Sequence, residues 1–251
     1  MRLLLALIFI PTLSFANPID DNCSDNVIFG APISSIKSDD QYICKLNYGI
    51  HYRYDTKTAE YVVEHLDSLD ITGDATRKDD FRPDPDIPDD KEAQLSDYAG
   101  QPYDRGHLVP AADNRTSKEV MSESFFLSNM VPQNPNNNRG IWRILESKTR
   151  DLGLTNDIYV ISGTIYEPGY LVIGDNKVGV PSKLWKVIYN NTDNTAIAFL
   201  FDNAPLKVAD LPLYAVNVNI IEELTGIDFF PKASDDKFES IQDFDKFFAK
   251  K

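Results

Sequence analysis

Hydrophobic and polar residues alternate in several stretches of this chain, as they do along β-strands. Residues 42–55, YICKLNYGIHYRYD, show the pattern, and it recurs in DIYVISGTIY at 157–166, SKLWKVIYN at 182–190 and TAIAFLFDN at 195–203. Two shorter extended segments are expected at 104–111 and 124–133. These segments predict a β-sheet.

Three other stretches have apolar residues at helical spacing. TAEYVVEHLD at 58–67 shows this period, and IWRILESKTRDLG at 141–153 shows it with Gly153 as a stop. YAVNVNIIEELTG at 214–226 predicts a last helix that ends at Gly226. Helices and strands are mixed without a regular βαβ alternation, so we expect an α+β fold with a mainly antiparallel sheet.

The most irregular stretch runs from Arg77 to Gln94. It holds three prolines and seven acidic residues, which predict a surface loop rather than a domain boundary. No internal repeat interrupts the chain, and a chain of this length can build one substantial core. We therefore expect a single domain over residues 17–251.

Residues 1–16, MRLLLALIFIPTLSFA, carry one positive charge, then an apolar run, and end in small residues. This pattern predicts a signal peptide cleaved after Ala16. The alternative is a membrane anchor, but Leu3 to Ala16 spans 14 residues, and crossing a bilayer takes about 20. The interpretation is an exported protein, periplasmic or extracellular, with no membrane partner.

The two cysteines, Cys23 and Cys44, both follow this segment. In an oxidising compartment they are expected to form a disulfide. Free or metal-bound thiols are the alternative.

The formal net charge is -14, which argues against binding to nucleic acid over the whole surface. Residues 101–150, however, carry seven Lys and Arg against five Asp and Glu, a balance of +2 that leaves -16 for the remainder. A mildly basic segment in an acidic chain is suited to holding a polyanion locally.

His107, one of only three histidines, directly follows Asp104, Arg105 and Gly106. A carboxylate can orient an imidazole, and a histidine with a pKa near 6.5 can act as a general base at neutral pH. A structural or surface histidine is the alternative.

Three consecutive asparagines, 136–138, precede the helix predicted at 141–153. They are typical of a loop with a helix cap, but an amide oxygen among them could also be a ligand of hydrated Mg²⁺. Glu146 lies eight residues after Asn138, about 12 Å along a helix axis. At that distance Glu146 is better placed to hold a metal-bound water than to bind the ion directly.

Three segments together carry a family resemblance: YDRGHLVPAADN at 103–114, FFLSNMVPQ at 125–133 and NNNRGIWRILE at 136–146. They resemble, in order and spacing, the DNA/RNA non-specific endonuclease family, whose members have the ββα-metal nuclease fold. The similarity runs from about Tyr61 to Pro231. It implies a metal-dependent endonuclease that hydrolyses phosphodiester bonds in DNA and RNA with little sequence preference and leaves 5′-phosphate ends.

The resemblance also implies roles for individual residues. His107 would be the general base, and Asn138 the sole direct protein ligand of Mg²⁺, for which Mn²⁺ could substitute. Glu146 would order metal-bound waters. Arg77 matches the arginine that stabilises the transition state, with Arg82 nearby as the alternative.

Three further residues fall at motif positions. Arg105, Asp104 and Asn129 would support the site, although hydrogen-bonded structural roles remain open for Arg105 and Asn129. A homodimer is compatible with the resemblance. The alternative function is a catalytically silent member of the same fold that binds nucleic acid or protein.

Overall fold

The computed structural model describes residues 18–34, 40–233 and 243–249. The signal peptide predicted at 1–16 lies outside these residues. No helix in the described part of the chain has the length and apolar composition needed to span a bilayer.

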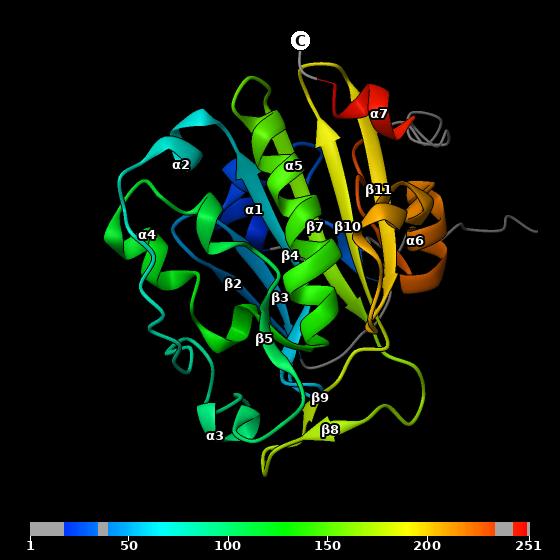
Figure 1. Cartoon of the computed structure of the whole chain (residues 1–251). Helices are drawn as coiled ribbons and strands as arrows, with labels where there is room; N and C mark the ends of the chain where they lie inside the picture. The colour runs from blue at the N-terminus through cyan, green and yellow to red at the C-terminus, as the bar shows by residue number, and fades with distance from the viewer. Residues whose placement is uncertain (1–17, 35–39, 234–242, 250–251) are drawn as a thin grey trace, which may run out of the picture.

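The central feature is a seven-stranded sheet in the order β12-β11-β10-β7-β4-β3-β2 (Figure 1). Every neighbouring pair in it is antiparallel, which confirms the predicted α+β fold. Its strands are β2 (Gln41–Cys44), β3 (Gly49–Arg53), β4 (Thr58–Leu66), β7 (Ile158–Ile165), β10 (Lys183–Asn190), β11 (Thr195–Asp202) and β12 (Ala215–Val216).

Three two-stranded ladders lie outside this sheet. They pair β1 (Ile33–Ser34) with β13 (Ile227–Asp228), β5 (Asp104–His107) with β6 (Met130–Gln133), and β8 (Val172–Ile173) with β9 (Val178–Gly179). The helices are α1 (Pro18–Asn22), α2 (Ser68–Thr72), α3 (Leu95–Tyr98), α4 (Lys118–Glu123), α5 (Arg143–Gly153), α6 (Val218–Thr225) and α7 (Phe244–Phe247).

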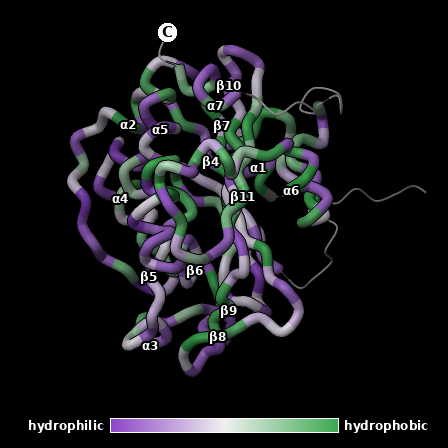
Figure 2. The backbone as a smooth tube through the Cα atoms, turned by 45° about the vertical axis from the view of Figure 1, so that its right-hand side comes forward, coloured by the Kyte–Doolittle hydropathy of each residue, from purple (hydrophilic) through white to green (hydrophobic). Residues whose placement is uncertain are grey.

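Helices cover both faces of the sheet (Figure 1). On one face α5 packs Leu145 and Leu152 into a core that also contains Val62 of β4 and Val160 of β7. On the other face α6 and α1 contribute Val218, Ile221 and Ile19 to a second core around Trp185. The sheet is therefore the middle of three layers, and hydrophobic residues occur both in its strands and in helices such as α6 (Figure 2).

The helix predicted at 58–67 is wrong, because these residues form strand β4. β4 lies between β3 and β7 in the middle of the sheet, so both of its faces are buried. Even its polar residues Thr58, Glu60 and Glu64 are buried. A strand buried on both faces loses the alternation that identifies a strand in sequence.

The other two predicted helices form, each shortened at its start. α5 begins at Arg143 because residues Asn137–Trp142 form a π-helical turn, called η4, that breaks at Gly140. α6 ends as predicted at Gly226, whose φ of 69° is the left-handed conformation of a helix cap. The acidic segment 77–94 is irregular and largely exposed, and the loop after α2 is mainly hydrophilic (Figure 2).

The predicted disulfide between Cys23 and Cys44 is present. It joins the turn after α1 to the end of the edge strand β2. Cys23 is buried within the core around Trp185, on the face of the sheet that does not carry α5.

Candidate active site

All five residues predicted for the catalytic centre line a single cavity of about 380 Å³, which we call the catalytic cavity. Arg105 and His107 come from β5, Asn138 from η4, Glu146 from α5, and Arg77 from the irregular segment before β5. Residues up to 69 positions apart in sequence therefore meet at one place.

His107 ends β5 and its ring lies between two aromatic side chains. The ring centroid is 5.6 Å from that of Phe81 and 5.0 Å from that of Phe125. Its backbone carbonyl accepts a hydrogen bond from the indole of Trp142 at 3.2 Å. These contacts fix the position of the imidazole without engaging its nitrogen atoms.

The Nε2 atom of His107 is buried and has no hydrogen-bond partner among the described residues. Burial, helped by the charges of Arg77 and Arg105, lowers the pKa of His107 to about 3. The imidazole is thus neutral at physiological pH, the form that can accept a proton.

Asn138 is oriented by Asp104. Its Nδ2 donates to Oδ2 of Asp104 at 2.9 Å, so its Oδ1, on the other branch of the amide group, is not used by this hydrogen bond. The same carboxylate accepts two hydrogen bonds from Arg139, at 2.8 and 2.6 Å. Asp104 therefore supports the site from outside the catalytic cavity, leaving the amide oxygen for a hard cation.

Gly106 is required by the close approach of β5 and β6. A Cβ at this position would lie 2.0 Å from Oε1 and 2.7 Å from Cβ of Gln133. Gln133 in turn donates from Nε2 to Oδ1 of Asn137 at 2.9 Å. The glycine between Arg105 and His107 thus lets a buried glutamine support the turn that carries Asn138.

Glu146 lies one helical turn after Trp142, in a setting that disfavours its charge. Burial raises its pKa to about 7, an effect that Lys186 of β10 and Arg150 oppose and that Asp113 reinforces. Asp113 is buried and forms an ion pair with Arg150. A cation in the catalytic cavity would favour the ionised carboxylate.

Three arginines of the catalytic cavity were not predicted as site residues: Arg139, Arg143 and Arg150. Arg143 and Arg150 lie on the same side of α5 as Glu146, three residues before it and four after it. That helical spacing was the signal that could have identified them in the sequence. With Arg77 and Arg105, five arginines line the catalytic cavity and, among the described residues, Glu146 is the one acidic residue in its lining, so the cavity is basic.

Besides Asp104, two more of the residues named from the sequence lie outside the catalytic cavity. Arg82, the alternative to Arg77, bonds the backbone carbonyls of Asp80 and Ser122 and lies 4.0 Å from the Phe126 ring centroid. Asn129 is fully buried and its side chain bonds the backbone N–H and carbonyl of Val109. Asn129 thus fixes the chain just after His107, which is the structural role left open for it.

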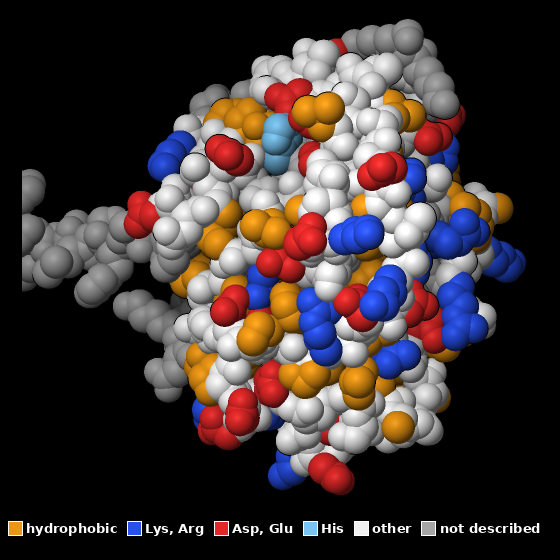
Figure 3. All heavy atoms as spheres, turned by 90° about the vertical axis from the view of Figure 1, so that its left-hand side faces the viewer, with side chains coloured by type: hydrophobic (Ala, Val, Ile, Leu, Met, Phe, Trp, Pro, Cys, Tyr) orange, Lys and Arg blue, Asp and Glu red, His pale blue; other side chains and the backbone are white. Residues whose placement is uncertain are grey.

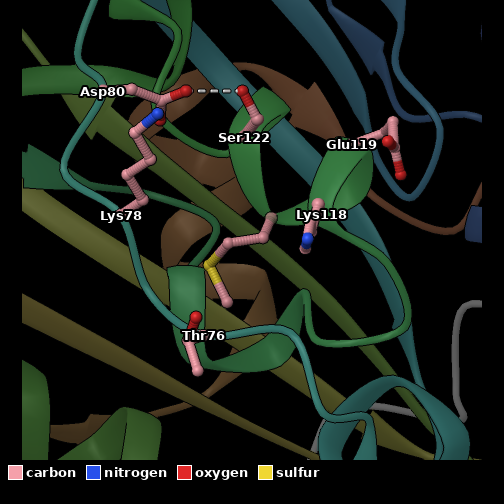
Figure 4. Close-up of a pocket in the computed structure, with 7 residues that line it drawn as sticks. Thr76, Lys78, Asp80, Lys118, Glu119 and Ser122 are labelled. Atoms are coloured by element: carbon pink, nitrogen blue, oxygen red, sulfur yellow. Dashed lines mark hydrogen bonds between the residues drawn. The ribbon is translucent and has the colours of Figure 1, made fainter.

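A second cavity, of about 470 Å³, lies beside the segment that carries Arg77 (Figure 4). Thr76, Lys78 and Asp80 line it from that segment and residues of α4 line it from the other side. Asp80 accepts a hydrogen bond from Ser122 at 2.7 Å. Lys and Arg side chains gather on one side of the face shown in Figure 3.

Comparison with known proteins identifies relatives over most of the chain. The family model for DNA/RNA non-specific endonucleases matches residues 27–236. The mitochondrial nuclease EXOG of Xenopus laevis is 39% identical over 83% of this chain and 62% of its own length. Human mitochondrial endonuclease G is 33% identical over 81% of this chain and 72% of its own.

A solved structure, described as an EndoG/EndoGI complex, has the same fold. It matches with a TM-score of 0.77 and 25% identity, over 86% of this chain and 94% of that one. The chain spans only about three fifths of the length of the EXOG relatives.

The expectation of an exported protein, periplasmic or extracellular, is wrong. The EXOG and endonuclease G relatives are named mitochondrial nucleases, and this finding contradicts the expectation of export. The expectation rested on the positive charge, the apolar run and the small residues at 1–16, and such a local pattern does not by itself identify a destination.

The resemblance carried by the three sequence segments is confirmed by the match of the family model and by the fold. The predicted catalytic residues meet in one cavity, and the matches to Xenopus laevis EXOG and human endonuclease G each cover about four fifths of the chain. This chain belongs to the DNA/RNA non-specific endonuclease family.

Proposed function

We propose that this protein is a divalent-metal-dependent endonuclease that hydrolyses phosphodiester bonds in both DNA and RNA with little sequence preference. The observation that carries the proposal is the meeting of a neutral histidine, an oriented amide oxygen, a carboxylate and five arginines in the catalytic cavity. A cavity of this composition fits a phosphodiester and a hard cation.

His107 is the general base in this proposal. Its neutral imidazole takes a proton from the water that attacks phosphorus, while the new P–O bond forms opposite the departing 3′ oxygen. Cleavage of the P–O3′ bond leaves the phosphate on the 5′ end of the product. The rings of Phe81 and Phe125 hold the imidazole in place for this transfer.

Asn138 and Glu146 would hold the cation. The Oδ1 atom of Asn138 would be its direct protein ligand, and Glu146 would hold part of its hydration shell. We propose Mg²⁺ as the ion, with Mn²⁺ as a substitute, because hard oxygen ligands suit both. When bound, the cation would act as a Lewis acid and stabilise the negative charge that develops on the departing oxygen.

The arginines differ in their availability for phosphate. Arg77, Arg139 and Arg150 each form an ion pair with an aspartate: Asp79, Asp104 and Asp113. Arg105 and Arg143 have no carboxylate partner among the described residues. Arg105 is therefore ready to meet the scissile phosphate, and Arg77, which is exposed and paired only with the exposed Asp79, can exchange that partner for the transition state.

The test is cleavage of supercoiled plasmid and of total RNA, with Mg²⁺ or with EDTA. We expect both substrates to be degraded only with the metal, and His107→Ala to lower the rate by about a hundredfold or more. Asn138→Ala should be similarly impaired and should need more metal.

Two matched variants control for the substitutions themselves. His65→Ala removes a histidine that pairs with Asp157 outside the catalytic cavity, and Asn136→Ala removes an exposed neighbouring asparagine. Both should cleave like the wild type. Cleavage that persists in EDTA, or in His107→Ala, would overturn the proposal, and a wild type inactive with every metal would favour the silent binding protein.

A further inference from the structure

Two more cavities form a row with the catalytic cavity. Each cavity in the row shares one lining residue with the next. Arg105 lines both the catalytic cavity and a cavity of about 230 Å³ beside α3. Tyr103 lines that cavity and a third one, of about 300 Å³, which reaches the turn at residues 167–171. We call these two cavities of about 230 and 300 Å³, with Tyr98, Tyr103 and Tyr170 in their walls, the tyrosine groove.

The groove lies at the end of the molecule where α3 and the β8–β9 ladder approach each other (Figure 1). β5 leads from this end directly to His107. The tyrosine groove therefore lies next to the catalytic cavity, and Arg105 lines both of them.

The tyrosines of the groove are held in place. Tyr103 is half-buried and packs against a small core that contains Leu127 and Met130. Tyr170 is half-buried, and its ring meets that of Tyr166 edge to face at 5.0 Å. The turn that presents Tyr170 is closed by its own N–H, which donates to the carbonyl of Glu167 at 3.1 Å, and Gly169 in this turn has a φ of 80°.

The tyrosine groove is lined by fewer charged residues than the catalytic cavity. Beyond Arg105, only Asp104 and Glu167 among the residues that line the groove are charged. The carboxylate of Asp104 is already engaged by Arg139 and Asn138. The catalytic cavity is thus suited to phosphate, whereas the groove offers aromatic and neutral polar surface.

We propose that the tyrosine groove binds the nucleobases next to the scissile phosphate, by stacking on Tyr103 and Tyr170. This inference rests on the proposed nuclease function. Bases stack on aromatic side chains whatever their identity, so such a groove adds affinity without sequence preference. The bases must first leave their own stack, which costs less in a single strand than in a duplex.

The test measures binding of a fluorescent single-stranded oligonucleotide by anisotropy in EDTA, where cleavage is suppressed. Loss of one stacking contact should weaken binding about tenfold, so we expect Tyr103→Ala and Tyr170→Ala each to raise Kd by that factor. Tyr103→Phe and Tyr170→Phe keep the ring and should bind like the wild type. Tyr159→Ala removes a tyrosine that stacks on His65 outside the groove, and it should change nothing.

An oligonucleotide with abasic sites in place of its bases separates stacking from any change in the protein. The alanine variants should bind this ligand as the wild type does, because there is no base to stack. An equal loss on the normal and abasic ligands, or no loss on either, would overturn the proposal. Failure of the nuclease proposal would appear separately, as a wild type that binds the oligonucleotide but does not cleave it with metal.

Discussion

At the scale of single residues, two titrating groups of the site have pKa values that are shifted in opposite directions. Burial raises the pKa of Glu146 to about 7, whereas burial and two arginines lower that of His107 to about 3. His107 is therefore already in its basic form wherever Glu146 changes charge. The group that limits activity on the acid side is predicted to be the carboxylate rather than the imidazole.

This order of pKa values predicts the pH dependence of metal binding. Only the ionised carboxylate of Glu146 attracts a cation, so the affinity for Mg²⁺ should fall as the pH drops through about 7. Glu146→Gln should bind Mg²⁺ weakly and with an affinity that does not change over that range. Calorimetric titrations with Mg²⁺ at several pH values measure this, with the exposed Glu119→Gln as a control. The prediction fails if Glu146→Gln keeps the wild-type pH dependence.

At the scale of elements, strands β5 and β6 pack closely against each other at Gly106. This contact fixes the position of the site residues on β5. Gly106 faces Gln133, whose own Cβ would be only 2.7 Å from a Cβ at position 106. Rotation of the glutamine side chain alone cannot relieve that contact. One of the two strands must move, and β5 carries both Asp104 and His107.

Gly106→Ala is accordingly predicted to impair both stability and activity. Overpacking of this kind lowers the free energy of unfolding by about 1–3 kcal/mol. A displacement of β5 near 1 Å would lower kcat by about a hundredfold, because His107 moves with the strand. Urea unfolding and plasmid cleavage measure the two effects. A variant that unfolds and cleaves like the wild type would show that the ladder accommodates the methyl group.

How far the elements could be predicted depends on burial. β7, β10 and β11 were identified from their sequence patterns, as was α5, which has one buried face. β4 was taken for a helix because Glu60 and Glu64 are polar yet buried between two layers. Polarity in a sequence indicates a solvent-facing position only when the tertiary structure leaves that position exposed.

The residues of the candidate site could be predicted from the sequence, but the ion pairs that hold them in place could not. Most of its residues fall in short motifs that can be recognised in the sequence, and helical spacing also marks Arg143 and Arg150. The pairs of Asp104 with Arg139 and of Asp113 with Arg150 join residues 35 and 37 positions apart. No local pattern predicts such contacts, because they depend on how η4 and α5 pack against residues 104–113.

At the scale of the whole molecule, the charges are divided between the site and the rest of the chain. The net charge is -14, yet residues 101–150 carry +2, and the catalytic cavity has five arginines and one glutamate. An acidic surface repels phosphate everywhere except at such a cavity. If the proposed function holds, a polyanion is expected to be drawn to the catalytic cavity and held weakly elsewhere, which favours the release of products.

The disulfide gives a prediction that separates stability of the whole molecule from activity. Cys23 and Cys44 are 21 residues apart, and closing a loop of that size stabilises the folded state by about 3 kcal/mol in the chain-entropy model. The double variant Cys23→Ser/Cys44→Ser should lose that amount of unfolding free energy in urea. It should keep the wild-type kcat, since Cys23 packs in the core on the sheet face opposite α5.

Wild-type protein treated with a reductant provides the matched comparison, because it should unfold like the double variant. Equal stability of all three forms would contradict the prediction, and a loss of kcat in the folded double variant would mean that the two faces of the sheet are coupled.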